Sequence, residues 1–324
     1  MKNLVWFRND LRLHDNPALS QACAKADQVV GIYIVTFKQW EEHNDSPNKI
    51  AFWFRSLIEL QKDLHKLNIP LCILKCDTYD DCPQKILEFA SANEIHNLYF
   101  NIEYPVNELK RDEQVQAVLE KMGTSCFSFH DQVIHVPGTL KTKAGTNFSV
   151  YSPFKRCWLA ELDYAMLEEH AIPTIKQPVS VNQQDEYDLH SYKQSNINQD
   201  LWPVGEESIQ KMIVNFLDRK GSDYKTDRNF PGLTATSMMS PYINSGVVSS
   251  KWCLNQARAR NYDALDEGDK GLVHWISEIL WREFYRHIIY NFPRVSMGKA
   301  FQEHFEQVPW LSLIHISEPT RHLL

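Results

Sequence analysis

The sequence predicts an α/β domain with a doubly wound parallel sheet, followed by an all-α domain. In roughly the first 130 residues, short apolar runs rich in β-branched and aromatic side chains alternate with longer segments of helical periodicity. This alternation is typical of a parallel sheet with helices on both faces. Beyond Trp202 every segment has helical periodicity. With 324 residues, of which 43% are hydrophobic and 23% charged, the chain is long enough for two domains with cores of their own.

The first domain contains five expected strands and four expected helices. The strands are the apolar runs at 4–7, 29–35, 71–75, 97–101 and 126–129. The helices lie between them at 17–26, 47–67, 83–94 and 107–122. No GxGxxG motif follows the first strand, so we do not expect a dinucleotide to be bound through the usual glycine-rich turn.

The second half begins with a long connection. Proline and glycine residues predict a loop at 130–153, then a helix at 154–169, and the Gln, Asn, Ser and Asp residues of 176–200 predict a surface linker. Further helices are expected at 205–219, 240–245, 249–260 and 269–291. We therefore divide the chain into an α/β domain at 1–130, a connection at 131–200 and a helical domain at 201–311.

Composition excludes several classes of protein. A net charge of −7 argues against general binding to polyanions, although a local basic patch can still bind a nucleic acid. The seven cysteines include no CxxC pair and no zinc-finger spacing, which indicates reduced thiols and no metal site. The charged start of the chain and the absence of an apolar run of 18 residues favour a cytoplasmic protein over a secreted or membrane protein.

The segment WISEILWREFYRH, residues 275–287, predicts a helix with two distinct faces. One face is an ordinary apolar stripe of Ile276, Leu280, Phe284 and Ile288. The opposite face spans an arc of about 140° and is too aromatic to be a solvated surface; it consists of Trp275, Glu278, Trp281, Arg282, Tyr285 and Arg286. Two interpretations remain open: this face binds a flat polar ligand, or it packs against neighbouring segments that pair its charges.

Four motifs together carry a resemblance to a known family. MKNLVWFRNDLRLHDNPAL at the start, YPVNELKRD at 104–112, TATSMMS at 234–240 and WISEILWREFYRHIIYNFP at 275–293 resemble the DNA photolyase and cryptochrome family. The resemblance is greatest to class I cyclobutane pyrimidine dimer photolyases. It implies an antenna domain followed by a helical domain that holds FAD. It also implies a monomer in which light drives an electron from reduced FAD to a dimer flipped out of DNA.

The same resemblance assigns roles to residues of the helical domain. Positions that match the FAD site are Tyr224, Thr236, Ser237, Met238, Met239, Ser240, Trp275 and Arg282. Glu278 and Trp281 match positions that touch the lesion, as a buried carboxyl and a stacking surface, and Arg228 and Arg282 match positions on the DNA side. Met238 stands where the family commonly has a basic residue, which removes a charged phosphate contact. Without a ligand, 236–240 is a Ser/Thr helix cap and Arg228 a surface arginine.

In the first domain, Asn107 and Glu108 match positions that hold a methenyltetrahydrofolate-type antenna in some members. Alternatively, Asn107 caps a helix and Glu108 interacts with its dipole. Ser296 and Met297 differ from the residues that complete the folate site in the best-known members, which argues against a folate. Trp310 aligns with the surface tryptophan of the family's electron-transfer chain.

The resemblance ends after Leu311, before the two inner tryptophans of that electron-transfer chain. Residues 312–324, SLIHISEPTRHLL, look like translated sequencing-adapter DNA, with a short natural tail as the alternative. We therefore expect an incomplete helical domain and no repair activity from the chain as written. Two other functions remain open: a cryptochrome-type blue-light receptor, which Glu278 beside Trp281 disfavours, and a non-catalytic fragment that folds only its α/β domain.

Overall fold

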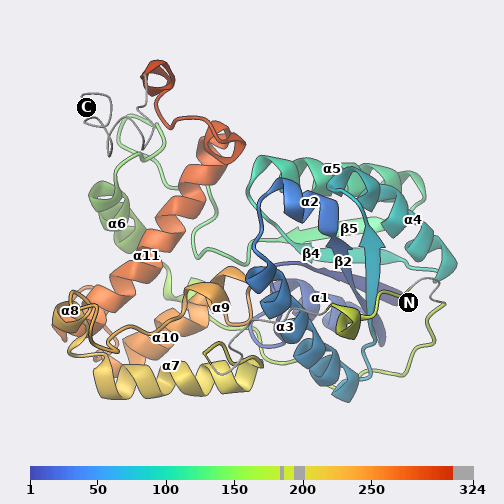
Figure 1. The fold of residues 1–324 in the computed structure, drawn as a ribbon, viewed down its shortest axis with the longest axis horizontal. Helices are drawn as coiled ribbons and strands as arrows, with labels where there is room; N and C mark the ends of the chain where they lie inside the picture. The colour runs from blue at the N-terminus through green and yellow to red at the C-terminus, as the bar shows by residue number, and fades with distance from the viewer. Residues whose placement is uncertain (183–185, 193–200, 309–324) are drawn as a thin grey trace, which may run out of the picture.

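The computed structural model describes residues 1–182, 186–192 and 201–308 (Figure 1). Its first part is a parallel sheet of five strands in the order β3-β2-β1-β4-β5. The predicted parallel sheet is confirmed, and the first and last residues of each predicted strand lie within two residues of those observed. The strands are β1 (Lys2–Phe7), β2 (Gln28–Thr36), β3 (Leu71–Cys76), β4 (Asn97–Asn101) and β5 (Ser125–Phe129).

Helices cover both faces of this sheet. Alternate strand residues point to opposite sides, so Phe7 of β1 lies in one apolar cluster and Trp6 lies in the other. Leu19 of α1 and Leu57 of α3 join the cluster of Phe7, whereas α4 and α5 pack with Trp6. The helices are α1 (Pro17–Lys25), α3 (Pro47–Lys66), α4 (Cys82–Ala92), α5 (Val106–Lys121) and the short α2 (Phe37–Glu42), which the sequence did not predict.

The sheet reverses its strand order between β1 and β4, which is where open α/β sheets usually bind ligands. Buried ion pairs occupy this position. Arg8 lies 3.1 Å from Asp112, and Arg111 lies 2.8 Å from Glu103, all with side chains at most 7% exposed. Because these charges neutralise one another, we assign the ion pairs between β1 and β4 a role in stabilising the domain.

The connection differs from its prediction at both ends of its helix. Helix α6 runs from Tyr151 to Ala160, whereas 154–169 was predicted, and a 3₁₀ turn follows at Tyr164–Leu167. Pro153 lies inside the first turn of α6. The backbone nitrogens of the first turn need no helical partner, so proline is tolerated there. The loop predicted at 130–153 therefore ends before Pro153.

The described parts of the predicted surface linker 176–200, which are 176–182 and 186–192, are docked on the α/β domain. Backbone nitrogens of Lys176 and Tyr187 donate to the carbonyls of Leu67 and Ile73, each at 2.9 Å. Leu189 is only 5% exposed. The segment therefore follows the α/β domain closely, held by backbone hydrogen bonds that its polar composition did not reveal.

The remaining described helices form the second part of the molecule. They are α7 (Glu206–Lys220), α8 (Tyr224–Asp227), α9 (Ser240–Asn244), α10 (Ser250–Arg260) and α11 (Lys270–Asn291). Helix α10 packs against α7 and α11, and α6 lies along α11 (Figure 1). The predicted stripe of Ile276, Leu280, Phe284 and Ile288 is confirmed, because each side chain is at most 8% exposed. All seven cysteines are free thiols, and none of the described helices is long and apolar enough to cross a membrane.

A loop after β1 joins the two parts. The guanidinium of Arg12 forms a buried ion pair with Asp131 and donates to the carbonyl oxygen of Gly246 at 3.1 Å. Gly246 has φ +67°, and a Cβ atom there would collide with the carbonyl group of Asn9. Only glycine therefore allows this close approach of the two chain segments.

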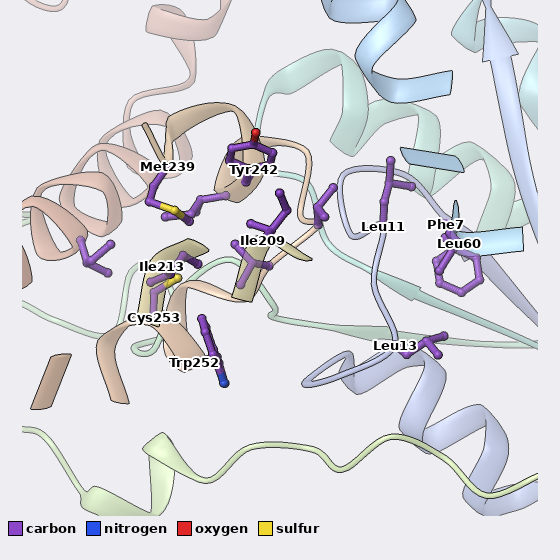
Figure 2. Packing of buried hydrophobic residues seen from close by; sticks show 14 of the residues in the cluster. Phe7, Leu11, Leu13, Leu60, Ile209, Ile213, Met239, Tyr242, Trp252 and Cys253 are labelled. Carbon is purple, nitrogen blue, oxygen red and sulfur yellow. The ribbon is translucent and has the colours of Figure 1, made fainter. Parts of the chain in front are cut away.

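The carboxylate of Glu206, at the start of α7, binds the same loop by accepting hydrogen bonds from Leu13 N at 2.8 Å and His14 N at 3.1 Å. The apolar core is continuous across this junction. Figure 2 shows Phe7 and Leu11 from the first part in one cluster with Ile209 and Tyr242 from the second.

Candidate functional site

A cavity of about 800 Å³ lies between the loop that precedes α9 and one face of α11. It gathers most of the residues that the sequence singled out in the helical part. These are Tyr224, Thr236, Ser237, Met238, Met239, Ser240, Trp275, Glu278 and Arg282. The lining also includes Trp202, Asn244, Ile279, Tyr285, Arg286 and Ile289.

The aromatic wall of the cavity is fixed by a hydrogen bond. Trp275 is 2% exposed, and its Nε1 donates to Oγ of Ser237 at 3.2 Å. The interpretation of 236–240 as a Ser/Thr helix cap is wrong, because α9 is preceded by Met239 and has no side-chain cap. Met238, which follows Ser237, has φ +54°, a conformation that non-glycine residues rarely adopt outside functional sites and turns.

Two arginines of α11 face the cavity without an anionic partner. Arg282 donates from Nη1 to the carbonyl of Gln132 at 2.6 Å, and Arg286 donates from Nη2 to Oδ1 of Asn244 at 3.2 Å. Within the described part of the chain, neither guanidinium forms an ion pair. Burial lowers the pKa of Arg282 to about 9 and also lowers the pKa of Arg286.

Asp131 and Glu283 are the carboxylates whose charge raises the pKa of Arg282, but each of them binds other partners. Asp131 is paired with Arg12. Glu283 accepts hydrogen bonds from His135 N at 2.9 Å and from Nε1 of Trp158 at 2.7 Å, so it fixes the connection to α11. Both arginines are half-buried, and a cation with no counter-ion beside it attracts an anion. The arginine pair therefore indicates a site for an anionic ligand.

Glu278 lies at the rim and is not the buried carboxyl that we expected. Its side chain is 37% exposed and forms an ion pair with Arg228, and Nε2 of His274 lies 3.6 Å away. Arg228 also donates to the hydroxyl of Tyr224 at 3.2 Å, but it does not line the cavity. The interpretation that α11 pairs its charges with neighbouring segments is thus confirmed for Glu278.

Trp281 does not line the cavity either. Its indole stacks on the ring of Tyr151 from α6, with ring centroids 3.7 Å apart and planes inclined by 13°. No sequence pattern pointed to this partner, because the residues before Pro153 were interpreted as loop.

Asn107 and Glu108 lie outside the 800 Å³ cavity, near the start of α5. Asn107 is not the helix cap, because α5 begins at Val106 after Pro105 and Asn107 is exposed, 3.3 Å from Nε2 of His43. Glu108 lies in the first turn, as expected, and burial raises its pKa. Ser296 supplies the missing cap: its Oγ accepts from Val106 N at 3.1 Å.

The sequence model of the family described as DNA photolyase matches residues 3–177. The chain belongs to the DNA photolyase family. It is 33% identical over 320 residues to the deoxyribodipyrimidine photo-lyase of Buchnera aphidicola from Acyrthosiphon pisum, covering 97% of this chain and 65% of the relative. It is also 33% identical over 311 residues to the enzyme of that name from Escherichia coli K12, covering 96% and 65%. The chain thus spans about two thirds of the length of these photolyases.

Solved structures share the fold. A class III photolyase of Agrobacterium tumefaciens superposes with a TM-score of 0.83 at 24% identity, covering 98% of this chain and 64% of that protein. A Synechocystis cryptochrome gives 0.83 at 19% identity, covering 98% and 67%. A Sulfolobus tokodaii photolyase, described with two FAD molecules, gives 0.75 at 20% identity, covering 98% and 66%. Because photolyases and a cryptochrome share the fold, the fold alone does not distinguish these functions.

Some lining residues of this photolyase-family cavity had no role assigned from the sequence. Tyr285 and Arg286 were placed on the possible ligand face of residues 275–287 without a role of their own. Arg286 follows Arg282 by one helical turn, so the spacing was a usable signal. Trp202 and Asn244 come from distant segments without a motif, and only the tertiary structure places them here. Trp310 and residues 312–324 lie outside the described residues.

Proposed function

We propose that the function of this protein is to bind FAD and to split cyclobutane pyrimidine dimers in DNA with light. The observation that carries the proposal is the cavity, in which Trp275 and the unpaired guanidinium groups of Arg282 and Arg286 face one space. Its volume of about 800 Å³ is in the range of cofactor sites. The curated relatives named deoxyribodipyrimidine photo-lyase support this activity over that of a light receptor.

The donor set of the cavity suits an anionic, aromatic cofactor. Arg282 and Arg286 would hold the diphosphate of FAD by charge-assisted hydrogen bonds. The hydroxyls of Tyr224, Thr236, Ser237 and Ser240 would contact its polar groups. Met238 has no charge with which to contact the phosphates from the loop. Arg282 and Arg286 of α11 would supply the positive charge instead.

Light-excited reduced FAD would supply the electron that opens the cyclobutane ring. At the rim, Glu278 would accept a hydrogen bond from an N–H of the dimer and hold Arg228 where its positive charge stabilises negative charge that develops on the bases. Trp281 would stack on the flipped bases. Arg228, already held beside Glu278, would contact a nearby DNA phosphate.

We also propose the finer assignments that follow from the family. Residues 1–130 form the antenna domain, 131–200 the connection and 201–311 one portion of a larger flavin-binding domain. Asn107 and Glu108 would hold a folate-type antenna, although Ser296 is engaged in capping α5. The protein would act as a cytoplasmic monomer. The expected lack of repair activity in these 324 residues alone stays a prediction.

A repair assay tests this function. The chain, and separately any longer product of the same gene, is mixed with FAD, a reductant and an oligonucleotide that carries one thymine dimer. We expect blue light to restore the undamaged bases with the longer product, and no reaction in the dark. A longer product that binds FAD but leaves the dimer intact in light would refute the proposed repair and favour the light receptor.

A further inference from the structure

Tyr151 and Trp281 form the closest ring pair among the described residues, with centroids 3.7 Å apart and planes 13° from parallel. This is the arrangement in which a nucleic-acid base stacks on an aromatic side chain. Tyr151 is the first residue of α6, and Trp281 lies in the middle of α11. One helix therefore supplies a flat support for an aromatic side chain of the other.

The position of Tyr151 is fixed by contacts on several sides. Its hydroxyl donates to the carbonyl oxygen of Ser277 at 3.0 Å, and its ring meets Phe284 edge-on at 5.9 Å. One turn later, Nζ of Lys155 donates to Oγ of Ser277 at 2.9 Å. Because α6 is attached to α11 on both sides of this turn, Tyr151 does not move independently of α11.

The angular positions around α11 show which face of the indole is covered. Ser277 and Phe284 lie on the side that packs against α6, whereas Glu278 and Arg282 lie on the cavity side. At about 100° per residue, Trp281 falls on the border between these two sides. Tyr151 therefore covers the indole from the α6 side. On the side toward Glu278, the neighbour of the indole is the offset ring of Tyr285, with centroids 5.6 Å apart and planes inclined by 27°, and a base would stack there.

We infer that Tyr151 is a positioning residue that holds the indole of Trp281 ready to stack on a pyrimidine dimer flipped out of DNA. The inference rests on the proposed function. It adds Tyr151, which contacts Trp281 on the side away from the proposed lesion site. An indole that is already held in one rotamer loses less conformational entropy when a base stacks on it. The support thus strengthens binding of the lesion although Tyr151 does not touch the DNA.

Two substitutions separate the ring from the hydroxyl. Tyr151→Leu removes the flat support, whereas Tyr151→Phe keeps the ring and loses only the hydrogen bond to Ser277. The probe is a fluorescently labelled single-stranded oligonucleotide with one thymine dimer, and the same oligonucleotide without the dimer is the control. Binding to the 324-residue chain is measured in the dark by fluorescence anisotropy.

We expect Tyr151→Leu to weaken binding of the dimer oligonucleotide about two- to twelvefold, the range that corresponds to one aromatic pair. Binding of the undamaged oligonucleotide should not change, and Tyr151→Phe should behave as the wild type. In a chain that carries Trp281→Leu, the additional change Tyr151→Leu should have no further effect, because the two residues act as one unit.

The outcomes distinguish the inference from the function on which it rests. A wild-type chain without preference for the dimer overturns the proposed lesion site together with the role of Tyr151. A preference that survives Tyr151→Leu overturns only the role of Tyr151, and equal losses in the Leu and Phe variants assign the effect to the hydrogen bond instead of the ring. If near-UV circular dichroism shows that Tyr151→Leu is unfolded, Tyr151→Met, which fills the space flexibly, replaces it with the same expected outcomes.

Discussion

Nε1 of Trp275 donates a hydrogen bond to Oγ of Ser237 across 3.2 Å, which ties the central helix of the second part to the loop that precedes α9. Both residues line the 800 Å³ cavity. Trp275 is almost fully buried, and a buried indole nitrogen needs a hydrogen-bond acceptor. The hydrogen bond therefore holds the two lining segments together.

Ser237→Ala tests the importance of this contact. It leaves Nε1 of Trp275 unpaired and removes a proposed contact to FAD, so we expect FAD affinity to fall by about 0.5–1.5 kcal/mol, the usual net contribution of one hydrogen bond. The dissociation constant is measured by flavin fluorescence quenching. Ser208→Ala, at an exposed position of α7 outside the cavity, is the matched control. Unchanged affinity in Ser237→Ala would mean that FAD does not depend on this wall.

The charge of Arg286 is the second point to test. Arg286→Met removes one of two cations that lack an acidic partner, and we expect the dissociation constant for FAD to rise about tenfold or more, as for hydrogen bonds to charged groups. Arg286→Lys should restore part of the affinity. The measured affinity should also fall with added salt in the wild type, and less so in Arg286→Met. Equal salt dependence in both proteins would contradict a role of Arg286 in binding the diphosphate.

Glu278 should contribute to the reaction more than to stability. Its ion pair with Arg228 is about one third exposed, so Glu278→Gln should change the free energy of unfolding by at most about 1 kcal/mol. Its proposed effect is on charge that develops only during ring opening. In the longer gene product, we therefore expect the repair yield per photon to fall while affinity for the dimer changes less. A normal yield in Glu278→Gln would exclude this role.

Glu206 makes the junction between the two parts sensitive to pH. Burial raises the pKa of its carboxyl from 4.5 to about 7, although the backbone nitrogens of Leu13 and His14 oppose the shift. The folded chain therefore binds this proton more tightly than the unfolded chain. The resulting stabilisation is complete below pH 4.5 and is lost as the pH rises through 7, with an upper limit of about 3 kcal/mol.

Urea unfolding of Glu206→Gln between pH 4.5 and 7.5 measures this contribution. Since glutamine cannot ionise, the stability difference between wild type and variant should shift in favour of the variant as the pH rises. Glu207→Gln, at the exposed neighbouring position, should leave the pH dependence of the wild type nearly unchanged. Parallel stability curves for wild type and Glu206→Gln would show that folding does not raise the pKa of Glu206.

Much of the fold could be predicted because local patterns and tertiary structure agree. The strands and most helices are marked by apolar periods of two and 3.6 residues, and the stripe from Ile276 to Ile288 identifies the buried face of α11. Composition did not show where tertiary contacts fix a segment or move the end of a helix. The polar segment from Lys176 is docked through backbone nitrogens and oxygens, which every residue type carries, and Pro153 is accommodated inside α6.

The site could be predicted only where its residues lie in a motif. Residues 236–240 and the cavity face of α11 are contiguous or periodic in the sequence, so they were found. Whether a side chain lines the cavity depends on its neighbours, which no motif records. Trp281 is turned against Tyr151 and Glu278 is held at the rim by Arg228, and both partners come from other segments.

The apolar cluster that runs from Phe7 to Tyr242 has a consequence for how the molecule comes apart. Two domains with separate cores melt one after the other, whereas parts that share a core lose it together. Heating should therefore give one calorimetric transition whose van't Hoff and calorimetric enthalpies agree. A protease should cut the chain without leaving a lasting fragment of the sheet alone, because the surface that α3 and the loop after β1 present to α7 and α9 would be exposed at the first cleavage. The contacts across the junction therefore contribute to the cooperativity of unfolding as much as the contacts within either part.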